Sequence, residues 1–214
     1  TLNPDANAAQ TTWNIVNGGT STVVCSGGGY ANNSLITATC CLPNGCYDLQ
    51  VFDSMGDGIN PGGFVLRDIN TNRIIDNANN GNTFTSLSKA APSFCVPLGT
   101  DALTAGSCDQ MSLPPNGTLT AVVNPAVSAQ YNLTNSTSGY QWHIFNPHGG
   151  YTRMIFLAHN TGGGPNGATK CATLKLADIV TLPVPQNVVL NVRVRSRVAG
   201  TYAAWGGVCR MRVG

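Results

Sequence analysis

The sequence contains no glutamate, and its nine acidic side chains are all aspartates. Charged residues make up 9% of the 214 residues, against roughly a quarter in a typical soluble domain. Histidine is scarce, with only His143, His148 and His159, and neither a G-x-S-x-G nor an H-E-x-x-H motif occurs. Hydrolases need paired acids, or a nucleophile beside a base. We therefore expect a protein that is not an enzyme.

The chain also lacks long apolar runs and strong helix formers. No run approaches the roughly 20 apolar residues that span a bilayer, and no charged-then-apolar leader opens the chain. We expect no membrane insertion, and we expect this sequence to be an internal or processed segment of a longer exported protein. Valine, threonine, asparagine and 25 glycines favour short strands joined by turns. The composition predicts an all-β fold with almost no helix.

Strand-like segments separated by turn sequences form two groups along the chain. In 46–52, Tyr47, Leu49 and Val51 alternate with other residues and share one face. We predict two disulfide-stapled β-sandwich domains in tandem, of jelly-roll or Ig/FnIII type, over 1–92 and 112–214, with a disulfide-clipped junction at 93–111. The expected strands are 12–17, 20–26, 34–42, 46–52, 63–69, 72–76, 82–88, 117–123, 128–134, 139–145, 152–159, 172–179, 187–198 and 207–213.

Eight cysteines are present, an even number, without the spacing of a zinc site. Such a set indicates disulfides formed in an oxidising, extracellular compartment. We predict the pairs Cys95–Cys108 and Cys171–Cys209. The remaining four are expected to pair among themselves: Cys25, Cys40, Cys41 and Cys46.

The loop after the strand at 46–52 is the strongest candidate for a metal site. Its sequence "DSMGDG" partly matches the D-x-[DN]-x-[DN]-G calcium loop, in which carboxylate and carbonyl oxygens surround a hard cation. Asp53 and Asp57 fit the first and fifth positions, and Asn60 offers a further oxygen, but Met55 stands at the third position and no glutamate follows. Aspartate and asparagine also stabilise turns through their own backbone. We favour the turn and keep calcium as the alternative; no other cofactor is expected.

Charge is distributed unevenly along the chain. Residues 1–110 carry a formal charge of −5 and residues 111–214 carry +7. Because the two halves carry opposite charge, head-to-tail attraction between copies is favoured. In "VRVRSRV", alternation puts Arg193, Arg195 and Arg197 on one outer face, either as an adhesive or glycan-contacting surface or, as we favour, as a solvated sheet face. The small net charge of +2 and the absence of interleaved exposed aromatics argue against nucleic-acid binding.

Most of the chain resembles a known family. The stretch "TTWNIVNGG" followed by "GCYDLQVFDSMGDGINPGGFVLRD" is similar to the W-x-I…C-Y-x-(L/F)-x-(V/I)-x-D-S-x-G-D-G module of large modular surface proteins that Bacteroidota export through the type IX system. The stretch "GYQWHIFNPHGGYTRMIF", with the later Arg-rich strand, Trp205 and Cys209, resembles a β domain that often follows this module. The resemblance implies a bacterial cell-surface location and a role in adhesion, gliding or surface layers. Related loops often carry a cysteine where this chain has Asn60, which leaves the pairing of the nearby cysteines open.

Two functions fit these observations. The first is a non-catalytic structural or adhesive segment that associates with copies of itself, or with neighbouring domains of the same protein, in a fibre or surface layer. The second is a carbohydrate-binding module of a larger secreted enzyme, which would bind surface glycans through exposed aromatics. Trp142, Tyr151 and Trp205 are the candidates for that aromatic platform.

Overall fold

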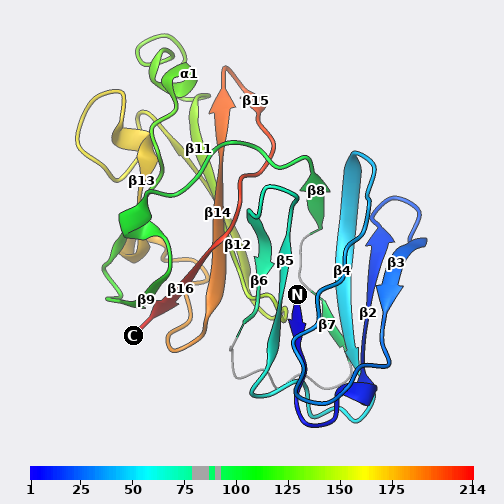
Figure 1. Ribbon diagram of the computed structural model, residues 1–214. Helices are drawn as coiled ribbons and strands as arrows, with labels where there is room; N and C mark the ends of the chain where they lie inside the picture. Colours follow the sequence, from blue (N-terminus) through cyan, green and yellow to red (C-terminus); the bar gives the residue numbers. More distant parts are fainter. Residues whose placement is uncertain (79–86, 90–92) are drawn as a thin grey trace. The chain divides into compact units, whose positions relative to one another are not determined.

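The computed structural model describes residues 1–78, 87–89 and 93–214, and strands dominate these residues in four sheets (Figure 1). The expected all-β class is therefore confirmed. The chain forms two compact units, one of Thr1–Pro97 with Asn146–Gly150 and one of Leu98–Phe145 with Tyr151–Gly214. The boundary between Pro97 and Leu98 falls within the segment 93–111, and the separate junction expected there stays a prediction.

The N-terminal unit contains two sheets. The larger has the strand order β3-β2-β4-β7, with β8 also paired to β4, and the smaller has the order β1-β5-β6. A short 3₁₀ turn, Ala8–Gln10, precedes β2. The strands are β1 (Leu2–Asn3), β2 (Thr11–Asn17), β3 (Val23–Gly27), β4 (Gly45–Asp53), β5 (Gly63–Arg67), β6 (Arg73–Asp76), β7 (Leu87–Lys89) and β8 (Phe94–Val96).

Alternation along β4 selects the residues that this unit buries. Tyr47, Leu49 and Val51 are all buried, as their shared face predicts. The ring of Tyr47 lies 5.9 Å from that of Phe94 on the adjacent β8. The strand at 46–52 was thus predictable from its period of two, whereas its pairing with β8 was not.

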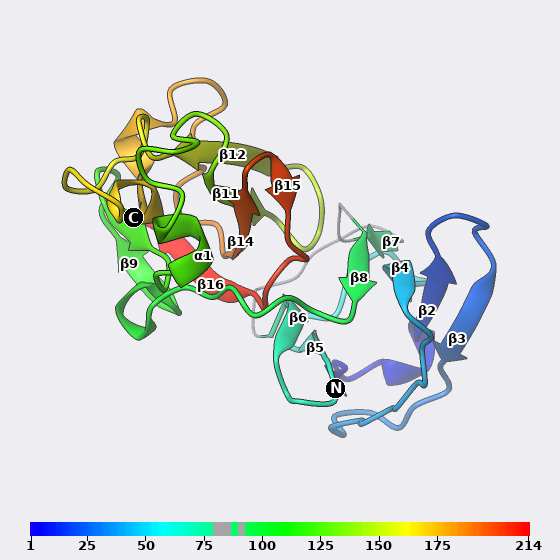
Figure 2. The same cartoon turned by 90° about the horizontal axis from the view of Figure 1, so that it is seen from above.

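The C-terminal unit also contains two sheets. The larger, seen from above in Figure 2, has the order β12-β11-β14-β16-β9, with β15 paired to β14. The smaller joins β10 and β13. Its strands are β9 (Gln110–Leu113), β10 (Thr118–Thr120), β11 (Gly139–Phe145), β12 (Thr152–Ala158), β13 (Thr173–Lys175), β14 (Leu190–Val198), β15 (Thr201–Tyr202) and β16 (Cys209–Val213). The helical turns are α1 (Pro125–Ser128), η2 (Ala105–Ser107), η3 (Lys170–Ala172) and η4 (Leu176–Asp178).

Both sheets of the C-terminal unit contribute to one hydrophobic core. Leu119 of β10 and Leu174 of β13 pack in the same cluster as Trp142 of β11 and Val192 of β14. These four side chains are at most 1% exposed. Burial of large apolar side chains on this scale is the main stabilising contribution to such a fold.

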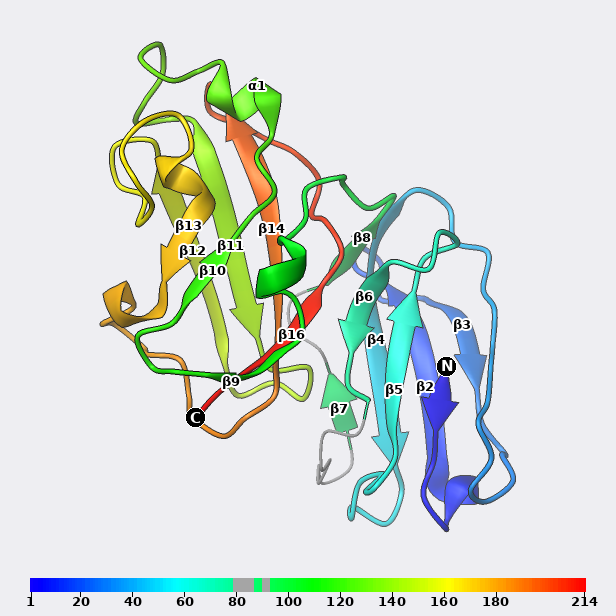
Figure 3. The same cartoon turned by 60° about the vertical axis from the view of Figure 1, so that its left-hand side comes forward.

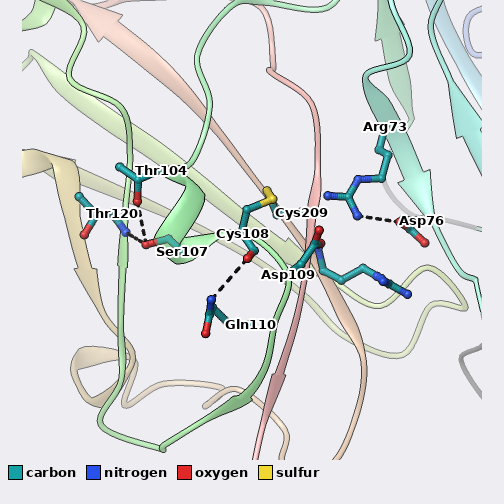
Figure 4. Close-up of a disulfide and its surroundings, with 10 residues drawn as sticks. Arg73, Asp76, Thr104, Ser107, Cys108, Asp109, Gln110, Thr120 and Cys209 are labelled. Atoms are coloured by element: carbon teal, nitrogen blue, oxygen red, sulfur yellow. Dashed lines mark hydrogen bonds and ion pairs between the residues drawn. A yellow bond between two sulfur atoms is a disulfide. The ribbon is translucent and has the colours of Figure 1, made fainter.

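Three disulfides stabilise the two units, and they differ from the predicted pairs. They join Cys25 to Cys40, Cys46 to Cys95, and Cys108 to Cys209. Figure 4 shows the last of these. The predictions Cys95–Cys108 and Cys171–Cys209 were wrong, because strand pairing brings other cysteines together: Cys46 lies directly opposite Cys95 in the β4–β8 ladder. Cys41 and Cys171 are free. Disulfides of this number indicate a secreted or extracellular protein.

Two expected strands do not form. Residues 34–42 contain only an isolated bridge at Ile36, and residues 128–134 form consecutive turns after α1. Asn124 caps α1 by accepting a hydrogen bond from the Ala126 N–H, and Pro125 occupies its first turn, so the chain enters a helical conformation there. Most of the strand expected at 82–88 lies outside the described residues. Within the described ranges, no helix is long and apolar enough to cross a membrane.

Candidate functional site

The outer face of the larger C-terminal sheet carries the three arginines that the sequence singled out. Val192 and Val194 of β14 are 0% exposed in the core, so the alternating Arg193, Arg195 and Arg197 lie on the opposite face, as expected. In the ladder with β11, Arg193 lies opposite His143 and Arg195 opposite Gln141.

These arginines alternate with aromatic rings in an arrangement that we call the arginine–aromatic stack. The guanidinium of Arg193 lies 4.9 Å from the ring centroid of Trp205, and that of Arg195 lies 4.4 Å from the same ring. Arg195 is also 4.2 Å from the ring of Tyr202. The stack comprises Phe145, Phe156, Arg193, Arg195, Arg197, Tyr202 and Trp205. Cation–π attraction and ring packing together hold the β15 segment against β14.

His143 also belongs to this stack, because its ring lies 4.7 Å from that of Phe145 and 5.6 Å from that of Trp205. Its Nδ1 accepts a hydrogen bond of 3.2 Å from Nε of Arg193, and its Nε2 lies 3.0 Å from Oγ1 of Thr152. Because an arginine Nε can only donate, Nδ1 must be unprotonated and Nε2–H donates to Thr152. Burial, with the charges of Arg193 and Arg195, lowers the pKa of His143 to about 3. This histidine is therefore neutral at physiological pH and serves as an acceptor for Arg193.

The exposure of the stack corrects two expectations. Arg193 is 2% exposed, so it belongs to the packed interior and not to a solvated stripe; Arg195 and Arg197 are partly exposed. Burial lowers the pKa of Arg193 to about 10, which leaves the guanidinium charged.

Two of the three aromatics proposed for a glycan platform, Trp142 and Tyr151, are buried at 0% and 8% exposure. Only Trp205 lies near the surface, and it is engaged in the stack.

Three aromatic members of the stack, Phe145, Phe156 and Tyr202, and one buried acid were not predicted from the sequence. The alternation of β11 and β12 already puts Phe145 and Phe156 on the arginine face, so that signal was present. Asp101 had no such signal. Its carboxylate accepts hydrogen bonds from the N–H of Ser196, at 2.7 Å, and from Nδ2 of Asn124, at 2.9 Å. It thereby joins the first residues of the C-terminal unit to β14.

The loop that starts at Asp53 is organised by hydrogen bonds to that residue. Asp53 is 1% exposed; its Oδ2 accepts from the N–H of Gly58 at 2.6 Å and its Oδ1 from the N–H of Met55 at 3.3 Å. Gly56 and Gly58 have φ angles of 79° and 78°, in the left-handed region that favours glycine. The side chain of Ile59 in the same loop is fully buried, at 0% exposure, and so holds the loop against the interior of the unit.

Two of the three candidate calcium ligands accept hydrogen bonds from groups of the protein. Asp57 is exposed and its Oδ1 accepts a hydrogen bond from Nε2 of Gln10, while Asn60 is exposed farther along the loop. Both oxygens of Asp53 face backbone donors of the loop. Within the described residues, no group of three or more His, Cys, Asp or Glu side chains is placed to hold a metal. Calcium at Asp53, Asp57 and Asn60 stays a prediction.

One buried pair has the connectivity of a nucleophile and its base. Sγ of Cys171 lies 3.4 Å from Nδ1 of His159, whose Nε2 lies 2.9 Å from the carbonyl oxygen of Val127. The carbonyl can only accept, so Nε2 carries the proton and the Cys171 thiol donates to Nδ1. Cys171 and His159 are 0% and 2% exposed, and burial raises the pKa of the thiol to about 11. The pair is closed to substrate and its thiol is not activated.

His148 occupies the expected turn, where its backbone N–H donates to Oδ1 of Asn146. In the described part of the chain, we find no histidine that combines an accessible ring with a neighbouring nucleophile. Comparisons of this chain with family models, with curated proteins and with solved structures found no match.

Proposed function

We propose that this chain is a non-catalytic structural segment of a bacterial surface protein that associates head to tail with copies of itself or with neighbouring domains. The observation that carries the proposal is the opposite charge of the two units. The N-terminal unit has six aspartates against Arg67, Arg73 and Lys89, a side-chain charge of −3. The C-terminal unit has eight lysines and arginines against three aspartates, a charge of +5. Contact between unlike units of successive copies is then electrostatically favoured.

The internal construction of the units supports a mechanical rather than a chemical role. The arginines that could bind a ligand are packed between aromatic rings, and the one thiol–imidazole pair is buried. We also propose that each unit is a β-sandwich. In the C-terminal unit this is supported by the shared core of Leu119, Leu174, Trp142 and Val192 across two sheets. The resemblance to modular type IX-secreted surface proteins supports the same role, in a fibre or surface layer.

Small-angle X-ray scattering on a concentration series tests this proposal. At low ionic strength we expect the mean particle mass to rise with protein concentration, because unscreened unlike charges attract. A particle that stays monomeric at the highest concentration and lowest salt would overturn the proposal.

The carbohydrate-binding alternative has less support. A glycan platform needs flat, accessible rings, and Trp142 and Tyr151 are in the core. A glycan array with no ligand would dispose of this alternative, whereas a ligand lost on Trp205→Ala with the fold intact would restore it.

A further inference from the structure

The strand β12 forms an unprotected edge of the largest sheet. Among the residues described, it pairs with β11 alone, so the backbone groups on its other side have no strand partner (Figure 3). It is seven residues long and contains no proline and no lysine; Arg153 is its one charge. Met154 is 51% exposed. Proteins usually shield such edges with charges, prolines, bulges or covering segments, because a bare edge is a template for another strand.

A groove lies beside this edge. Arg153, Ile155 and Leu157, the alternating side chains on one face of β12, line it together with residues of β13 and η4. The opposite wall consists of Leu174, Lys175, Asp178 and Ile179. Ile155 and Leu157 pack against the core and remain partly exposed. Nε of Arg153 is buried and has no hydrogen-bond partner among the residues that the structure describes. An incoming strand would cover the apolar side chains and bring backbone carbonyls to this donor.

The N-terminal unit has an apolar edge strand of its own, with one register shift in its pairing with β2, at Val24. The strand β3 stands at the end of its sheet and, within the described ranges, pairs with β2 alone. It contains neither a charge nor a proline. Val23 and Val24 are 49% and 45% exposed, and the Cys25–Cys40 disulfide fixes the middle of the strand. Each unit of the chain therefore presents an apolar strand edge, β12 in the C-terminal unit and β3 in the N-terminal unit.

We propose that β12 of one copy pairs with β3 of a second copy by strand addition, which joins the basic unit of one chain to the acidic unit of the next. The assignment rests on the proposed function and specifies its contact. A symmetric β12–β12 contact would instead bring together two units of charge +5, and a β3–β3 contact two units of charge −3. A contact between two different edges leaves one free edge of each kind on every dimer, so further copies can add head to tail.

Cross-linking distinguishes these arrangements. We would prepare Met154→Cys and Val24→Cys separately in a Cys41→Ser background, which removes the exposed free thiol. A short flexible bismaleimide then tolerates a small shift in register. We expect no cross-linked dimer from either variant alone, a dimer from an equimolar mixture, and a ladder of oligomers from the double variant. Dimers from Met154→Cys alone or from Val24→Cys alone would overturn the assignment in favour of a symmetric contact.

A matched pair of lysine variants gives an independent readout. Met154→Lys puts a charge on the edge strand, and Val122→Lys puts the same charge on an equally exposed residue of the same unit, since both side chains are 51% exposed. Long-range attraction is then altered equally in both variants. We expect Met154→Lys alone to weaken association, by about tenfold or more. Equal effects of the two variants would contradict the edge contact. If the unmodified chain does not associate at all, the proposed function fails; if it associates but shows neither effect, only the edge assignment fails.

Discussion

Nε of Arg193 donates a 3.2 Å hydrogen bond to Nδ1 of His143, across the β11–β14 ladder and inside the packed arginine–aromatic stack. A protonated His143 could not accept this bond, and it would face the positive charge of Arg193. The neutral state of one imidazole is thus a condition for the packing of the C-terminal sheet.

The first prediction concerns pH. Burial lowers the pKa of His143 from 6.5 to about 3, so between these values the unfolded state binds a proton that the folded state does not. Stability is then lost as the pH falls through this window, by at most about 1.4 kcal/mol per pH unit from this residue. Urea unfolding between pH 7 and pH 4, which covers roughly this window, measures the slope of the free energy of unfolding against pH. In His143→Gln the slope should shrink; an unchanged slope would place the dependence elsewhere.

The second prediction concerns Trp205, whose ring contacts the guanidinium groups of both Arg193 and Arg195. Trp205→Ala removes these contacts and leaves a void beside a buried charge. We expect a loss of about 3 kcal/mol in the free energy of unfolding, and a much smaller loss for Trp205→Phe, which keeps a ring. Chemical denaturation is the measurement. A loss of less than about 1 kcal/mol for the alanine variant would show that the stack stabilises little.

The buried faces of both larger sheets were predictable from sequence, because the alternation of side chains along a strand is a local pattern. A period of two along β4 and β14 identifies the buried faces, because neighbouring side chains of a strand point to opposite sides. The environment of Arg193 was not predictable, since its partners come from β11 and from the segment that contains Trp205. The contact of Asp101 with Ser196 spans 95 positions of sequence and leaves no periodic signal.

The disulfides illustrate the same limit. Cys46 meets Cys95 because β4 and β8 are adjacent in a particular register, and sequence spacing does not encode register between distant strands. The sequence predicted a turn at the candidate calcium loop, but not that Asp53 is buried there. Sequence spacing alone could not show whether Asp53 binds calcium, because its two carboxylate oxygens also accept hydrogen bonds from the backbone N–H groups of Met55 and Gly58.

The third prediction concerns that loop. Asp53→Ala leaves the N–H groups of Gly58 and Met55 without their acceptor, and we expect a loss of about 1–3 kcal/mol in stability. Asp57→Ala, at an exposed position, should change stability little. Melting temperatures of the unmodified protein in calcium and in chelator test the metal: an increase with calcium that both variants abolish would support the calcium site over the turn alone.

The fourth prediction concerns the cysteines. In the folded protein a thiol reagent should modify Cys41, which is exposed, and leave Cys171 unmodified, because Cys171 is buried and its thiol pKa is raised. Unfolding without reductant should release Cys171 for modification. Peptide mapping should recover linked peptides for Cys46–Cys95 and Cys108–Cys209. A linked Cys95–Cys108 peptide would contradict the strand pairing described above.

The most direct test of head-to-tail association is sedimentation velocity on the unmodified chain at two salt concentrations. At about 0.02 M salt, where charges attract over roughly 20 Å, we predict species larger than the monomer whose size increases with protein concentration. At about 0.5 M salt the attraction between the −3 and +5 units is screened, and the distribution should shift towards the monomer. A single monomeric species at both salt concentrations would contradict the account.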